Sequence, residues 1–144
     1  MYNKNSGEVC KKKVLIVDDD ADFVKMNKSF LELNGFEVSV AYSGKECMDI
    51  VDSVKPDIIL LDMMMETWSE GTNVVDKLRR YKYTKDTPII FITAINFRSH
   101  VSDMSDVESS INVDSYLVKP VLPETLLERV NDLLSKKSVG WTKI

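Results

Sequence analysis

Runs of consecutive apolar residues, each ending in a polar residue, dominate the hydropathy pattern of this 144-residue chain. The segments 14–17, 58–61 and 89–92 are apolar at every position. Runs of this length are typical of strands that are buried on both faces of a parallel sheet. The segment 36–40 instead alternates between apolar and polar residues, which predicts a half-exposed strand at the edge of the sheet. A short fifth strand is predicted over 116–118.

Residues with helical spacing fill the segments that separate these strands. Asn34-Gly35 ends the first helix, a capping box of Ser43 and Glu46 starts the second, and Pro123 suits the first turn of the last. A helix over 97–113 has the weakest signal, because this segment is rich in Ser and Asp, which prefer caps and turns. The residues expected to face the core, helix by helix, are Phe23, Met26, Phe30 and Leu33; Cys47, Ile50, Val51 and Val54; Val74, Val75 and Leu78 after Gly71; Val101, Met104, Val107 and Ile111; and Leu126, Leu127, Val130, Leu133 and Leu134.

The alternation of five strands with five helices predicts an α/β fold, a doubly wound five-stranded parallel sheet with helices on both faces. We expect one domain over 11–137, preceded by a flexible leader, 1–10, and followed by a C-terminal tail, 138–144. The residues after 137 are too few to fold as an output domain of their own. The sequence has no Gly-rich phosphate loop of the dinucleotide or the nucleoside-triphosphate kind.

Composition and charge narrow the possible functions. Hydrophobic residues make up 44% of the chain and charged residues 29%, which is ordinary for a globular domain. A net charge of −4 argues against direct nucleic-acid binding, which needs a basic face. Neither a transmembrane segment nor a signal peptide is apparent, so we expect no membrane association. The two cysteines, Cys10 and Cys47, do not suggest a disulfide framework and fit a cytoplasmic protein.

Polar side chains with chemical potential follow the predicted strands. Asp18 and Asp19 follow the first, Asp62 the third, Thr93 the fourth and Lys119 the fifth. Because the carboxyl ends of parallel strands meet at one edge of a sheet, these five side chains are expected to converge. Several carboxylates in one pocket repel each other and require a cation, and oxygen ligands without His or paired Cys favour Mg²⁺. Lys119 would add a fixed positive charge beside a carboxylate able to act as a nucleophile.

A simpler interpretation is available for Asp62 alone. Aspartate is common in turns, and Asp62 could serve only to cap the turn that follows its strand. The other polar residues at the strand ends are what favour a chemical role.

Five motifs together resemble the response-regulator receiver domain, of the chemotaxis-regulator type, over about residues 11 to 137. In chain order they are Val14-Leu15-Ile16-Val17-Asp18-Asp19-Asp20, Ala41-Tyr42-Ser43-Gly44-Lys45-Glu46, Pro56-Asp57-Ile58-Ile59-Leu60-Leu61-Asp62, Ile92-Thr93-Ala94 and Tyr116-Leu117-Val118-Lys119-Pro120. Each motif alone is weak, but their order and spacing together are specific. The resemblance implies a flavodoxin-like strand order of 2-1-3-4-5 and a part in two-component signalling.

The resemblance also implies a role for each residue. Asp62 would accept a phosphoryl group from a histidine kinase or a histidine phosphotransfer protein. Asp18, Asp19, Asp62 and the backbone carbonyl of Met64 would hold Mg²⁺. Lys119 would pair with the phosphoryl oxygens, and Thr93 and Tyr116 would act as the switch pair. The output would be a surface made by the fourth helix, fifth strand and fifth helix, which would bind a downstream protein.

On this interpretation the chain is not an enzyme with a separate substrate, although it promotes its own phosphorylation and dephosphorylation.

The sequence departs from the family at Glu66, where Pro is common, and at Gly71, which stands nine residues after Asp62 rather than eight. Asn112 replaces the usual Gly before the last strand, a mild change because Asn tolerates left-handed backbone. Met64 and Ile95 are apolar where many receivers place groups that orient attacking water, so we expect a long-lived phosphoryl group.

Two other functions fit parts of the pattern. A pseudo-receiver would bind partners without ever being phosphorylated, and the altered loop after Asp62 is the feature that favours it. Asp18 and Asp20 also resemble the nucleophile and acid of a phosphatase of the haloacid-dehalogenase type, although Asp62 and Lys119-Pro120 fit that family less well.

Overall fold

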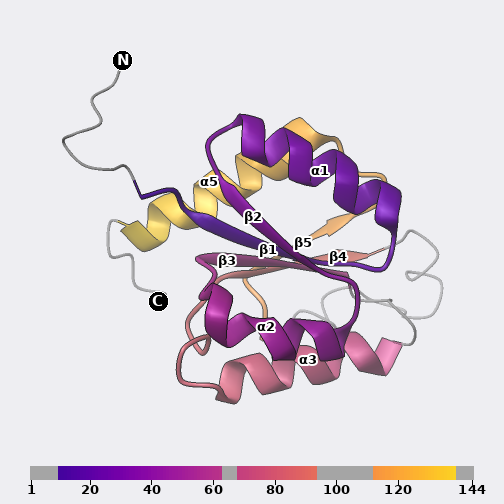
Figure 1. Ribbon diagram of the computed structural model, residues 1–144, viewed down its shortest axis with the longest axis vertical. Coiled ribbons are helices and arrows are strands. Elements are labelled where there is room, and N and C mark those ends of the chain that lie inside the picture. Colours follow the sequence, from indigo (N-terminus) through magenta and orange to yellow (C-terminus); the bar gives the residue numbers. More distant parts are fainter. Residues whose placement is uncertain (1–9, 63–67, 94–111, 139–144) are drawn as a thin grey trace.

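A five-stranded parallel sheet with helices on both faces forms the protein, as the hydropathy pattern predicts (Figure 1). The computed structural model describes residues 10–62, 68–93 and 112–138. The strand order is β2-β1-β3-β4-β5. The strands are β1 (Lys13–Val17), β2 (Glu37–Ala41), β3 (Ile58–Asp62), β4 (Ile89–Thr93) and β5 (Ser115–Val118). The helices are α1 (Ala21–Leu33), α2 (Gly44–Val54), α3 (Trp68–Arg80) and α5 (Pro123–Ser138). The helix predicted over 97–113 falls largely in 94–111, outside the described residues.

The sheet separates two hydrophobic layers. Helices α1 and α5 cover one face and α2 and α3 cover the other (Figure 1). Alternate residues of each central strand point to opposite faces, so Val14 and Ile16 pack toward α1 and α5, and Leu15 and Val17 pack toward α2 and α3. Every residue of β3 and β4 is buried, as expected for strands in the middle of a doubly wound sheet. The alternating strand, β2, lies at an edge, which confirms its sequence-based placement.

The core face of α1 differs from the prediction. Met26 is 49% exposed and Leu33 is 85% exposed, whereas the buried residues of this helix are Phe23, Val24, Asn27 and Leu31. The predicted apolar face was therefore wrong at Met26 and Leu33, whereas Phe23 is buried as predicted. The amide of Asn27 enters the core because its Nδ2 donates to the carbonyl oxygen of Phe23 at 2.9 Å, which satisfies part of a buried polar group.

The capping box of α2 is present. Ser43 Oγ accepts from the backbone N–H of Glu46 at 3.1 Å, and Glu46 Oε1 accepts from the N–H of Tyr42 at 2.8 Å. The second bond reaches one residue further back than in the usual box. Cys47 is fully buried under this helix, and burial raises the pKa of its thiol to about 12, so it stays protonated as an ordinary core residue.

Helix α3 begins at Trp68, three positions before the Gly71 that was expected to precede it. Glycine is tolerated near a helix N-terminus, where the first backbone N–H groups have no partner within the helix. At the other end of α3, Val74, Val75 and Leu78 are buried as predicted.

The C-terminal turn of α3 carries a contact that the sequence did not reveal. Arg79 Nη2 lies 3.0 Å from Asp114 Oδ2, and that oxygen also accepts from the backbone N–H of Ile89 at 2.9 Å. The Arg79 guanidinium further donates to four backbone carbonyl oxygens, those of Thr84, Lys85, Thr87 and Asn112. Arg79 thus ties α3 to the segments that lead into β4 and β5.

No helix in the described ranges has the length and apolar character needed to cross a membrane.

Candidate functional site

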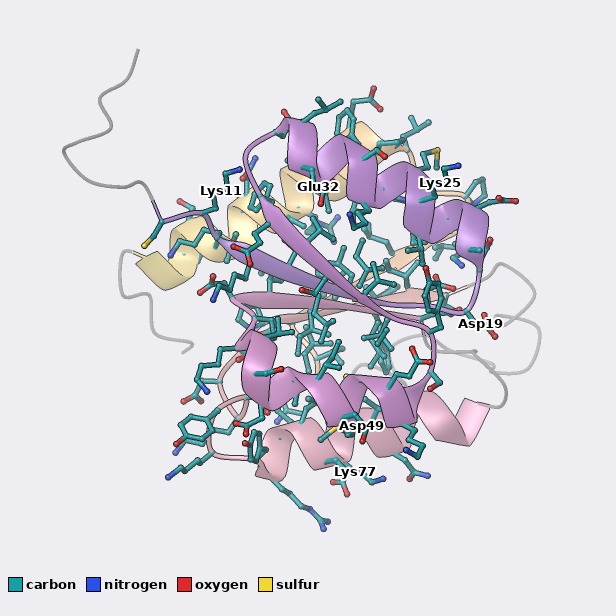
Figure 2. All side chains as sticks on the ribbon, viewed as in Figure 1. Lys11, Asp19, Lys25, Glu32, Asp49 and Lys77 are labelled. Carbon is teal, nitrogen blue, oxygen red and sulfur yellow. The ribbon has the colours of Figure 1, made fainter. Side chains whose placement is uncertain are left out.

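Three aspartates converge at the carboxyl edge of the sheet. Asp18 and Asp19 follow β1, and Asp62 is the last residue of the neighbouring strand β3. One carboxylate oxygen from each of the three lies within 4.8 Å of the others. Asp18 and Asp62 are buried and Asp19 is exposed, so the cluster opens to solvent on one side. Figure 2 shows Asp19 on the opposite side of the molecule from Lys11, which precedes β1. The predicted convergence of these carboxylates is present.

Lys119 brings a positive charge into the same cluster. Its Nζ lies 3.0 Å from Asp18 Oδ2 and 3.9 Å from Asp62 Oδ2. Its backbone N–H donates to the carbonyl oxygen of Thr93 at 2.7 Å, which fixes the start of the loop after β5 against the end of β4. The ammonium therefore bridges carboxylates from two different strands.

Local hydrogen bonds hold Asp18 in place. Its Oδ1 accepts from the backbone N–H of Asp20 at 2.9 Å, and its own N–H donates to the carbonyl oxygen of Ala41 at 3.0 Å. Asp20 is the N-cap of α1, and its Oδ1 accepts from the N–H groups of Asp22 and Phe23, both at 3.2 Å. Because the Asp20 carboxylate caps a helix, it is poorly placed to act as the acid of a phosphatase.

Thr93 and Tyr116, the residues expected to form a switch, lie on the neighbouring strands β4 and β5. Thr93 is buried at the end of β4, one position beyond Ile92, which is the register partner of Asp62. Tyr116 of β5 is the register partner of Phe91 of β4. Its side chain is partly buried and packs against the core layer under α2 and α3. Arg129 of α5 donates to Ser115 Oγ and, at 3.5 Å, to the carbonyl oxygen of Tyr116.

Met64, the expected source of a backbone carbonyl ligand, lies outside the described residues, as does Ile95. The predicted site residues that the structure describes are Asp18, Asp19, Asp62, Thr93, Tyr116 and Lys119.

The donor set fits a hard divalent cation. Three carboxylates face one ammonium, so the cluster carries an excess of negative charge. All of the acidic donors are oxygen atoms, which Mg²⁺ prefers, and the exposed side of the cluster leaves room for bound water. The cation in turn would lower the repulsion among the carboxylates.

Phe23 contacts a site residue, although its helical spacing predicts only a core role. The Nζ of Lys119 lies 4.4 Å from the centre of the Phe23 ring, within the range of a cation–π contact. A sequence signal for this contact is hard to find, because Phe23 and Lys119 are far apart in the chain and the aromatic residue also fits the helical apolar stripe.

Comparisons with known proteins agree with the fold. The sequence model of the response regulator receiver domain matches residues 14–131. The transcriptional regulatory protein CpxR of Escherichia coli K12 is 34% identical over 124 residues, which are 86% of this chain and 50% of CpxR. The transcriptional regulatory protein PrrA of Mycobacterium leprae is 37% identical over 131 residues, 90% of this chain and 53% of PrrA. The chain thus spans about half the length of these curated relatives.

Two solved structures are similar over nearly their whole length. The chemotaxis response regulator CheY4 of Vibrio cholerae superposes with a TM-score of 0.75 at 28% identity, covering 86% of this chain and 99% of CheY4. A CheY-like response regulator receiver domain protein of Methanospirillum hungatei JF-1 gives a TM-score of 0.76 at 27% identity, with coverage of 90% and 98%.

Proposed function

Since this chain belongs to the response regulator receiver domain family of two-component signalling, we propose that it accepts a phosphoryl group on Asp62 in a Mg²⁺-dependent reaction and thereby switches the binding of a partner protein. The donor is a histidine kinase or a histidine phosphotransfer protein. The observation that carries the proposal is the position of Lys119, whose Nζ lies 3.0 Å from Asp18 and 3.9 Å from Asp62 beside the three converging carboxylates.

The geometry supports Asp62 as the acceptor rather than its two neighbours. Asp18 already accepts the Asp20 N–H and is the closer partner of Lys119, so its carboxylate is held in place. Asp19 is exposed and suits a metal ligand that shares its cation with water. Asp62 is buried at the end of the central strand, with the Lys119 ammonium near one of its oxygens.

In the transfer step an Asp62 carboxylate oxygen attacks phosphorus, and a new P–O bond forms as the P–N bond to the donor histidine breaks. The electron pair of the P–N bond stays on the histidine nitrogen, and the imidazole leaves as a neutral group with a proton on its other ring nitrogen. Asp18, Asp19, Asp62 and the backbone carbonyl of Met64 would hold Mg²⁺, which would stabilise the negative charge of the phosphoryl oxygens. Lys119 supports the same oxygens with a fixed ammonium.

After transfer, a local change of charge biases a two-state element. Thr93 donates a hydroxyl hydrogen bond to the phosphoryl group, and Tyr116 turns inward behind it. This proposal is supported by the strand order, in which Thr93 lies on β4 beside the strand of Asp62 and Tyr116 lies on β5, one strand further. The signal is read on the surface of the fourth helix, β5 and α5.

The curated relatives are longer than the region that they share with this chain. CpxR and PrrA are named as transcriptional regulators and are about twice as long as the region they share with this chain. We propose that residues 11–137 form the receiver, which does not itself bind nucleic acid, and that its output is protein binding.

The first test is uptake of phosphate by the whole chain. Incubation with acetyl phosphate and Mg²⁺ should add one phosphoryl group to the intact mass, and EDTA should reduce the modified fraction to background, because the carboxylate cluster needs its cation. Uptake that is unaffected by EDTA would contradict the metal-dependent step. Mg²⁺ binding without uptake from any donor, including a panel of histidine kinases, would favour the pseudo-receiver.

A second prediction concerns the lifetime of the phosphoryl group. The double variant Met64→Asn, Ile95→Glu should lose its phosphate faster, on the order of tenfold, because polar groups at these positions can orient the attacking water. A radiolabel decay assay measures this rate, with Met65→Asn as the control for a polar substitution in the same loop. Equal decay of the double variant and the parent would refute the prediction.

A further inference from the structure

The ring of Phe23 forms one wall of the site and contacts the Lys119 ammonium. The Nζ atom lies 4.4 Å from the ring centre, 3.0 Å from Asp18 Oδ2 and 3.9 Å from Asp62 Oδ2. The ammonium therefore has an aromatic face on one side and carboxylates on the other. A cation over the negative face of an aromatic ring is attracted to it, and more strongly where water is excluded.

Both partners of this contact are anchored at the backbone. The N–H of Phe23 donates to the N-cap Asp20, and its carbonyl oxygen accepts from Asn27 Nδ2 at 2.9 Å. The N–H of Lys119 donates to Thr93 at 2.7 Å. The ring and the lysine stem are thus held by two different elements, α1 and the end of β5, before any phosphoryl group arrives.

We propose that Phe23 is a positioning residue for Lys119, and that its ring keeps the ammonium aimed between Asp18 and Asp62. Without the ring, the flexible lysine side chain is free to settle on Asp18, its closer partner, or to turn toward water. An ammonium already placed where charge develops needs no rearrangement during transfer. This role rests on the proposed function, since it concerns the residue that supports the phosphoryl oxygens.

The test compares two buried phenylalanines of the same core layer. Phe23 is 8% exposed and Phe36 is 7% exposed, and both pack in the layer under α1 and α5. Phe36 precedes β2, so it lies at the opposite edge of the sheet from the carboxylates. The change to Leu removes a ring from the core in both variants, but only Phe23→Leu removes it from beneath Lys119.

Phosphorylation by acetyl phosphate with Mg²⁺ should be about tenfold slower in Phe23→Leu, within a range of about twofold to thirtyfold. It should be unchanged in Phe36→Leu, and Phe23→Tyr, which keeps a ring, should retain most of the parent rate. An equal loss in both Leu variants, or no loss in either, would overturn the proposal.

An NMR measurement tests the contact without phosphorylation. The ring current of Phe23 should move the ε-methylene protons of Lys119 upfield in the parent and in Phe23→Tyr, and this displacement should vanish in Phe23→Leu but persist in Phe36→Leu. Lys119→Met assigns the signal. If the parent takes up no phosphate, the proposed function fails while the resonance still reports the contact; a signal that is the same in Phe23→Leu and the parent overturns the inference.

Discussion

Replacing Asp62 with Asn abolishes phosphate uptake from acetyl phosphate, and the intact mass of the variant stays that of the unmodified chain. The amide oxygen of Asn is a weak nucleophile, and the variant also loses one of the three carboxylates that would hold Mg²⁺. Lys119, Asp18 and Asp19 remain in this variant, and Mg²⁺ binding measured beside the parent separates the loss of the acceptor from the loss of a metal ligand. Intact mass spectrometry of the parent and the variant, treated side by side with Mg²⁺ and acetyl phosphate, measures it.

Two controls separate lost chemistry from lost structure. Asp57→Asn changes an acid just before the same strand, where Asp57 Oδ2 accepts from the Lys13 N–H at 2.8 Å, and an amide oxygen can accept that bond as well. This variant should be phosphorylated like the parent. Asp62→Asn should be no less stable to urea in Mg²⁺-free buffer, because it removes one buried negative charge from a cluster in which three carboxylates share one ammonium. Phosphorylation of Asp62→Asn at the parent rate would show that another residue is the acceptor.

The number of phosphoryl groups that the chain processes, and the aspartate on which this depends, distinguish a receiver from a phosphatase. A phosphatase of the haloacid-dehalogenase type would release phosphate repeatedly from a generic phosphate ester and would depend on Asp18. A receiver retains one phosphoryl group on Asp62. The capping of α1 by Asp20 supports the receiver, because the residue that would serve as the phosphatase acid is engaged by two backbone N–H groups. Trp68, the first residue of α3, provides a fluorescence signal close in sequence to Asp62, with Trp141 replaced to remove background.

The sheet and the carboxylate cluster were predictable because each depends on a local pattern. An apolar run followed by an acid defines both a central strand and the residue at its carboxyl edge, as Asp18 and Asp62 illustrate. In the same way, Thr93 is the last residue of β4 and Lys119 directly follows β5. Parallel pairing then brings these ends together without any further information from the sequence.

Contacts between side chains that are distant in sequence were not predictable. Met26 and Leu33 fit a helical stripe as well as the buried residues do, and only packing against the sheet decided that Asn27 and Leu31 face inward. Phe23 was predicted to be in the core, but its contact with Lys119 depends on how α1 sits above the end of β5. Arg79 stands near a helix C-terminus, where any cation is favourable, so the sequence does not indicate that its partners are in the loops before β4 and β5.

Replacing Arg79 with Met is expected to lower the free energy of unfolding by about 3 kcal/mol, because it removes the cation paired with the partly buried Asp114 carboxylate and the donors to several carbonyl oxygens. The Arg79 side chain is only 12% exposed, so water replaces these bonds poorly. Arg80→Met is the matched control: its side chain is 78% exposed, its pair with Asp76 is an exposed i,i+4 contact, and its loss should cost less than about 1 kcal/mol. Urea unfolding of the two variants measures both values. Equal, small losses would show that Arg79 is no more than a surface cation. A large loss for Arg79→Met alone would establish that α3 is tied to the lead-in segments of β4 and β5, the two strands that carry Thr93 and Tyr116.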